Sequence, residues 1–214
     1  MPEPLISVLS SRSYLGPLHT LASEFISVGL VFGPTDRDGS EKRHVLCIQH
    51  RDVRTRELLP KRPLLFDVVG QICHEDCFFT ADGIPHMDPP DEPVASCWLE
   101  PRPHMVSEIN WRGVHGSIEK VVAHISGPVD TSRLLAVGEN GEPKLQVIWQ
   151  GNPGESTAAL LPMYDAYGQH YVPMSLDQVP FGEAVHAVFS LQYYYNRVEN
   201  RRILFASLLR MHHA

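Results

Sequence analysis

The sequence of 214 residues is 43% hydrophobic and 20% charged, with a formal net charge of -7. This length is sufficient to bury a large core, and the composition excludes a wholly disordered chain. No apolar run reaches the roughly 18 residues of a membrane span, and no positively charged start precedes an apolar segment, as in a secretion signal. We therefore expect an intracellular protein, in the cytoplasm or the nucleus, without a membrane partner.

Charge is distributed unevenly along the chain. Residues 42–62 carry seven Lys or Arg and two acidic residues, whereas residues 74–100 carry seven acidic residues and no Lys or Arg. Neither half of the chain is basic overall. Contact with a polyanion would therefore need a local cluster of cations.

The N-terminal half reads mainly as strands. A short helix is predicted over 16–23, followed by strands over 24–32 and 43–50 that form a hairpin, and by strands over 63–72 and 95–99. Residues 81–93 are acidic and rich in proline, which favours an exposed loop. We place a boundary after this loop, giving subdomains 1–100 and 101–214, with one continuous domain as the alternative.

The C-terminal half contains the clearest patterns. A strand is predicted over 118–125, then a hairpin of 133–137 and 144–150 around Asn140-Gly141, a short helix over 155–161, and a final hairpin of 185–195 and 203–211. Side chains alternate between apolar and polar along the final hairpin, as in half-buried strands. The fold class is thus mainly β, an antiparallel barrel or sandwich with few short helices.

The order of elements in residues 112–214, a strand, a hairpin, a short insertion and a second hairpin, resembles that of the OB-fold. The resemblance implies a five-stranded Greek-key barrel. Such barrels bind oligonucleotides and oligosaccharides through the face of strands 2 and 3 and through two loops.

The final hairpin carries the main candidate site. Three consecutive tyrosines, 193–195, run into a loop with Arg197, Arg201 and Arg202. Rings stack on unpaired bases and guanidiniums neutralise phosphates, which indicates single-stranded nucleic acid as the ligand. Because strand side chains alternate between faces, Tyr194 must point away from its two neighbours. The predicted contacts are Trp149, Tyr194, Arg197, Arg201 and Arg202, with Arg51, Arg54 and Arg56 as secondary contacts.

Simpler interpretations of these residues remain open. The tyrosines would also suit an ordinary core beside a solvated loop. The basic stretch around Arg51 would equally well face the acidic loop of the same chain or of a second copy.

A second candidate site contains cysteines. The four cysteines, including Cys47, are too few for a disulfide scaffold, so we expect reduced thiols. Zinc would bind Cys73, Cys77, His86 and Cys97, although only the first two have the close spacing of paired zinc ligands. The alternative is a group of reduced thiols with no cofactor.

No nucleophile or phosphate-loop motif is present in the sequence, so we expect a protein that is not an enzyme. The leading hypothesis is a β-rich module that binds single-stranded nucleic acid. The first alternative is an assembly subunit whose strand edges pair with a protein partner or with another copy in a homo-oligomer. The second is a zinc-stabilised protein or enzyme centred on Cys73 and Cys77.

Overall fold

The computed structural model describes residues 28–34, 43–50, 52, 54–58, 61–80, 94–102, 105–123, 125, 127–151 and 161–213. Strands dominate this part of the chain, and one α-helix is present in it. In chain order the elements are β1 (Val28–Pro34), β2 (Arg43–His50), β3 (Arg62–Pro63), β4 (Leu65–Ile72), β5 (Val94–Glu100), α2 (Met105–Ala123), β6 (Val129–Asp130), β7 (Leu135–Val137), β8 (Pro143–Gln150), β9 (Met163–Tyr164), the 3-10 helix η2 (Leu176–Gln178), β10 (Ala184–Asn196) and β11 (Arg201–His213). No helix in these ranges is long and apolar enough to cross a bilayer.

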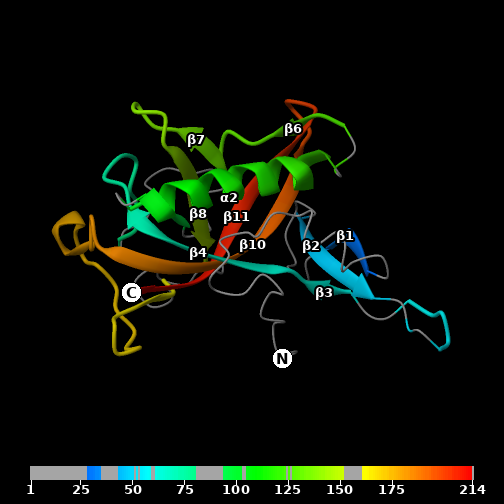
Figure 1. Ribbon diagram of the computed structural model, residues 1–214, viewed down its shortest axis with the longest axis horizontal. Helices are drawn as coiled ribbons and strands as arrows, with labels where there is room; N and C mark the ends of the chain where they lie inside the picture. Colours follow the sequence, from blue (N-terminus) through cyan, green and yellow to red (C-terminus); the bar gives the residue numbers. More distant parts are fainter. Residues whose placement is uncertain are drawn as a thin grey trace.

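Five strands close into a barrel. The hydrogen-bonded order is β4, β5, β8, β11 and β10, and β10 pairs back onto β4. All neighbours are antiparallel except β8 and β11, which are parallel. When the five barrel strands are numbered along the chain, their order around the barrel is 1-2-3-5-4, which is the order of an OB-like barrel. The mainly β, barrel-like fold class is therefore confirmed (Figure 1).

The five barrel strands are not the five that the sequence predicted for residues 112–214. β4 and β5 precede residue 101, so the barrel takes strands from both sides of the expected boundary. The predicted hairpin of 133–137 and 144–150 forms as β7 and β8, but β7 pairs with β8 and lies off the barrel path. The predicted final hairpin forms as the β10–β11 ribbon.

The strand predicted over 118–125 is wrong, because these residues lie mostly within α2. The buried apolar side chains of α2 recur every three or four residues, namely Trp111, Val114, Ile118 and Val121. That spacing is the period of a helix with one buried face. The short apolar run over 118–125 does not by itself distinguish such a helix from a strand.

Trp111 attaches α2 to the barrel. Its ring is fully buried, and its Nε1 donates a hydrogen bond to the carbonyl oxygen of Val69 in β4 at 3.0 Å. Gly70 makes room for this ring, since an added Cβ would lie 2.6 Å from a ring carbon of Trp111. The apolar core thus continues from the barrel interior to α2.

The N-terminal hairpin is present as β1 and β2, in register from Val28 opposite His50 to Pro34 opposite His44. β2 also pairs with the end of β10, so this hairpin extends the sheet beyond the barrel. The helix predicted over 16–23 lies outside the described residues, as do the acidic loop of 81–93 and all but the last residue of the helix predicted over 155–161.

Candidate functional site

The β10–β11 ribbon extends past its neighbouring strands. β10 pairs with β4 as far as Ser190 and with β2 as far as Tyr194, whereas its pairing with β11 continues to Asn196. Residues 197–200 close the ribbon with a turn. We call residues 193–202 the ribbon end. It projects beside β6, above the barrel in Figure 1.

One face of the ribbon end carries two tyrosine rings and a guanidinium. The Arg202 guanidinium carbon stands 6.0 Å from the ring centroid of Tyr195 and 5.9 Å from that of Tyr193. Tyr195 is 43% exposed, and its hydroxyl donates a hydrogen bond to Asn200. Tyr193 packs against the main core and stacks on His44, with 4.9 Å between ring centroids. Tyr195 thus offers an accessible ring beside a cation.

Arg202 is positioned through its backbone and by a glycine. Its N–H donates to the carbonyl oxygen of Pro128 at 3.0 Å, and β6 runs parallel to this part of β11. Gly127 has a φ of 86°, and an added Cβ there would lie 2.7 Å from Nη1 of Arg202. Glycine therefore permits both the backbone turn and the close approach of the guanidinium.

Carboxylates neutralise part of the charge at the ribbon end. Arg201 pairs with Asp130 at 3.2 Å and with Glu199 at 2.7 Å. The hydrogen bond from Arg201 lowers the pKa of Glu199. The Ser132 N–H lowers the pKa of Asp130, with smaller contributions from nearby arginines. The ribbon end with the adjoining Asp130 and Arg133 contains two carboxylates and the four guanidiniums of Arg133, Arg197, Arg201 and Arg202, which leaves a local charge of +2.

Tyr194 lies on the opposite face of the ribbon, as the alternation predicts. Its ring packs beside Phe205, with 6.0 Å between centroids, on a small cluster that includes Val94 and Ile148. Arg133 Nη1 donates to its hydroxyl at 3.5 Å. Tyr194 is thus a partly buried ring with a guanidinium at its polar end, and Tyr195 is the more open ring.

The tryptophans of the β5–β8 pair lie on opposite faces. Trp149 is 7% exposed and belongs to the main core, so we remove it from the candidate interface. Trp98 is partly exposed between the fully buried Cys97 and Leu99, which places it on the outward face, opposite Gln146. Sequence reasoning missed Trp98. The alternation within 95–99, with two buried neighbours, is the signal that could have identified it.

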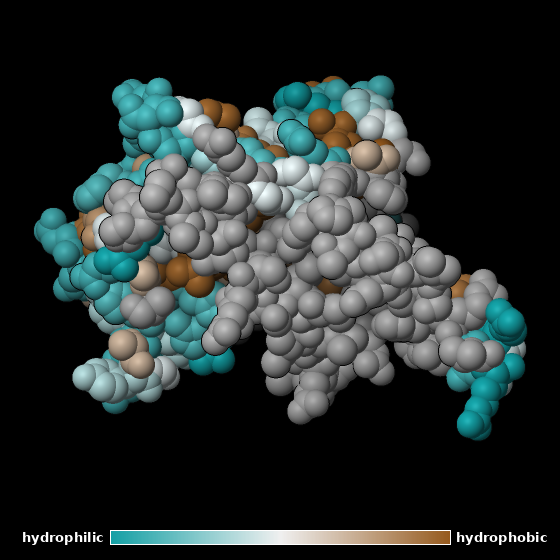
Figure 2. All heavy atoms as spheres, viewed as in Figure 1, coloured by the Kyte–Doolittle hydropathy of each residue, from teal (hydrophilic) through white to brown (hydrophobic). Residues whose placement is uncertain are grey.

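The basic turn after β2 is distant from the ribbon end. β2 meets β10 at Arg43, and the turn follows the other end of β2, roughly 23 Å away at about 3.3 Å per residue. Arg54 and Arg56 are exposed there, and the Asp52 carboxylate accepts the Arg54 N–H at 2.8 Å. This turn forms a hydrophilic projection (Figure 2). The structure therefore does not bring it to the tyrosines, and Arg51 lies outside the described residues.

Three of the predicted zinc ligands are buried near one another. The pKa of Cys77 is raised by burial and, to a lesser extent, by Cys73, and the pKa of Cys97 is raised well above its usual value by burial and by the other two thiols. Within the described ranges no group of three or more His, Cys, Asp or Glu side chains is arranged to hold a metal ion. His86 lies outside those ranges, and zinc binding stays a prediction.

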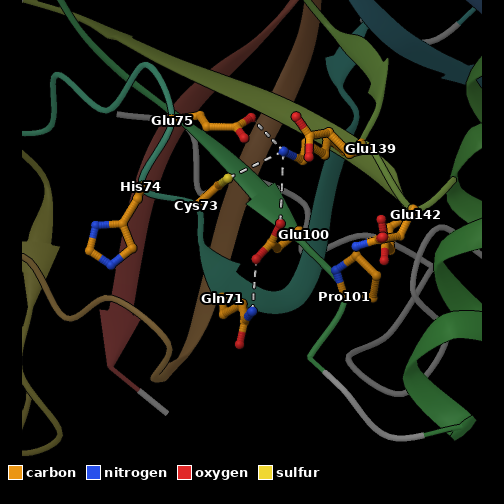
Figure 3. A pocket seen from close by; sticks show the side chains of 11 residues that line it. Gln71, Cys73, His74, Glu75, Glu100, Pro101, Glu139 and Glu142 are labelled. Atoms are coloured by element: carbon orange, nitrogen blue, oxygen red, sulfur yellow. Dashed lines mark hydrogen bonds and ion pairs between the residues drawn. The ribbon is translucent and has the colours of Figure 1, made fainter.

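An acidic cavity of about 380 Å³ lies beside Cys73 (Figure 3). The Nζ of the buried Lys144 lies 3.4 Å from Cys73 Sγ, 2.7 Å from the Glu75 carboxylate and 4.0 Å from that of Glu100. The bond to Glu75 raises the pKa of Lys144. Two further glutamates line the cavity, Glu139 and Glu142. Four carboxylates around one ammonium repel a polyanion, so this cavity is not a phosphate site.

Neither a protein-family model nor a curated protein matches the sequence. Among solved structures, the chain is similar to the single-stranded DNA-binding protein of bacteriophage Enc34 in complex with ssDNA, with 13% identity and a TM-score of 0.46 over 86% of this chain and 94% of that one. It is also similar to gp2.5, a single-stranded DNA-binding protein encoded by bacteriophage T7, with 15% identity and a TM-score of 0.41 over 70% of this chain and 91% of that one.

Proposed function

We propose that this protein is a non-enzymatic module that binds single-stranded nucleic acid, DNA in the first instance, through the ribbon end. The observation that carries the proposal is the exposed Tyr195 ring with the Arg202 guanidinium 6.0 Å from its centroid, on a turn that projects from the sheet. A base stacks on such a ring while neighbouring guanidiniums neutralise phosphates. Duplex DNA hides its base faces, so single strands are the preferred ligand.

The barrel surface supplies a path for the bound nucleic acid beyond the ribbon end. OB-like barrels bind oligonucleotides on the face of their second and third strands and through the loop between the fourth and fifth. Here those strands are β5 and β8, and that loop is the turn of the ribbon end. Trp98 and Gln146 lie on the outward face of β5 and β8. Trp98 shares this face with Val94 and Ile148, against which Tyr194 packs, so a nucleic-acid strand that passes Tyr194 would reach Trp98 as a further stacking ring.

Titration of a fluorescent single-stranded oligonucleotide, followed by anisotropy, tests the proposal. We expect a Kd of about 1 µM or lower at about 50 mM salt, with weaker binding as salt rises. Arg197→Gln should reduce the slope of log K against log salt by about 0.7, the value for one phosphate contact on a single strand. Arg102→Gln, which removes an exposed arginine outside the ribbon end, is the matched control. Absence of binding at low salt would overturn the proposal.

A second candidate function, assembly through a strand edge, is favoured by the position of β1. β1 ends the strand order, and its free edge pairs with no other strand of the described residues. Such an edge presents backbone N–H and C=O groups that another chain can pair with. Light scattering on the purified chain tests this function, because a strictly monomeric species that binds DNA would exclude self-assembly.

A further inference from the structure

A row of four rings crosses three strands at the far end of the ribbon. His186 of β10, His212 of β11 and Tyr164 of β9 are neighbours, with 6.3 Å and 5.5 Å between successive ring centroids. His170 meets Tyr164 edge-on at 5.6 Å. The Arg210 guanidinium stands 4.9 Å from the Tyr164 centroid. We call these five residues the imidazole patch.

A β-bulge brings the patch onto one face. Leu208 and Met211 are both buried in the core although they lie three positions apart, because the register with β10 shifts between Val188 and Phe189. The extra residue, Leu209, is exposed. After the bulge, Arg210 and His212 share the outward face of the ribbon, as bulges re-aim side chains. Regular alternation would have turned Arg210 toward the core.

The rings of the patch suit a base, and within the described residues no group of three or more His, Cys, Asp or Glu side chains is arranged to hold a metal ion. Burial, followed by Arg210 and His186, lowers the pKa of His212, which favours the neutral form of its ring. His170 is exposed, and its Nε2 donates to the carbonyl oxygen of Leu161 at 2.7 Å, which holds the ring in place. Arg210 is exposed and supplies a positive charge beside the rings.

We propose that the imidazole patch is a second stacking site for single-stranded nucleic acid, which a nucleic-acid strand bound at the ribbon end reaches along the face of β10 that carries Tyr194, Gln192 and His186. This inference rests on the function proposed above. The ring row supplies the stacking surface and Arg210 a phosphate contact, the same pair of interactions as at the ribbon end.

The length of the ribbon sets which oligonucleotides can reach both sites. His186 and Tyr194 lie on the same face of β10, eight residues or roughly 26 Å apart at about 3.3 Å per residue. A nucleic-acid strand with stacked bases advances roughly 3.4 Å per nucleotide, so about eight nucleotides cover that distance. A fragment of about four nucleotides reaches one site only.

Oligonucleotides of about four and about twelve nucleotides, titrated against the full chain, separate the two sites. Tyr164→Ala should weaken binding of the longer strand about five-fold or more and change binding of the shorter one less than about two-fold. Arg210→Gln, at an exposed position, should reduce the salt slope of the longer oligonucleotide by about 0.7. The control is Tyr167→Ala, because this tyrosine of the same loop is 89% exposed and outside the patch.

The outcomes distinguish this inference from the proposed function. Failure of the wild-type chain to bind either oligonucleotide would overturn the proposed function. Binding that both patch substitutions leave unchanged for the longer strand would overturn the imidazole patch alone. Equal losses for both lengths would also overturn it, because the patch would then belong to the primary contact.

Discussion

The ribbon end and the Lys144 cavity both contain basic side chains, yet they suit opposite ligands. At and beside the ribbon end there are four guanidiniums and two carboxylates, and both carboxylates pair with Arg201. In the cavity a single buried ammonium is surrounded by four glutamates. The chain as a whole carries -7. Local balance and exposure, rather than net charge or the presence of a lysine, therefore decide where a polyanion can bind.

The largest expected effect is a loss of DNA affinity, which should follow a substitution at the ribbon end but not one at the Lys144 cavity. Tyr195→Ala removes the open ring of the ribbon end and should cost about 1–3 kcal/mol of binding free energy, or about 5- to 150-fold in Kd. Anisotropy titration measures it, with thermal unfolding to confirm that the fold is intact. Tyr167→Ala, at a tyrosine that is 89% exposed, should bind like the wild type. Equal affinities for the two variants would argue against the ribbon end as the contact.

The next effect should appear in stability and not in binding. Lys144→Met leaves Glu75 and Glu100 without their ammonium partner, so we expect the free energy of unfolding to fall by about 1–2 kcal/mol. Urea denaturation measures this change. DNA affinity should stay within about two-fold, with the exposed Lys61→Met as the control. A large loss of affinity without a loss of stability would place the cavity in the binding site.

The smallest effect tests the charge balance of the ribbon end. Asp130→Asn keeps an oxygen for the Ser132 N–H but no longer neutralises Arg201, so DNA binding should tighten about two- to three-fold. The pKa of Asp130 is lowered in the folded chain, so its stabilisation is present above the unfolded pKa and is lost as pH falls through the folded value. Below about pH 4 the variant should therefore lose less stability than the wild type, by under about 1 kcal/mol. An equal loss of stability in the variant and the wild type as pH falls would exclude this contribution of Asp130.

Much of the fold could be predicted from local patterns. The hairpins formed by β1 and β2, β7 and β8, and β10 and β11 are confirmed, because alternation and turn residues act over a few positions. The strand over 118–125 failed because a short apolar run has both helical and extended interpretations. The helical spacing becomes clear only over the whole of α2, in which Trp111 is buried against β4.

The sequence placed the candidate site on the final hairpin but did not show which of its rings are open. The opposite orientation of Tyr194 and its neighbours followed from strand geometry. The greater exposure of Tyr195 did not, since it depends on where β2 and β4 stop pairing with β10. Trp149 was misplaced because its partners in the core come from distant parts of the chain.

The sequence by itself determined features that depend on neighbouring residues: the periods of the ribbon strands, the alternating faces of the tyrosines and the clustering of arginines after them. Tertiary structure decided which strands close the barrel, which rings stay open and which arginine charges are neutralised. The physical reason is that burial and ion pairing join residues far apart in the chain, such as Arg201 with Asp130, and no local pattern contains that information.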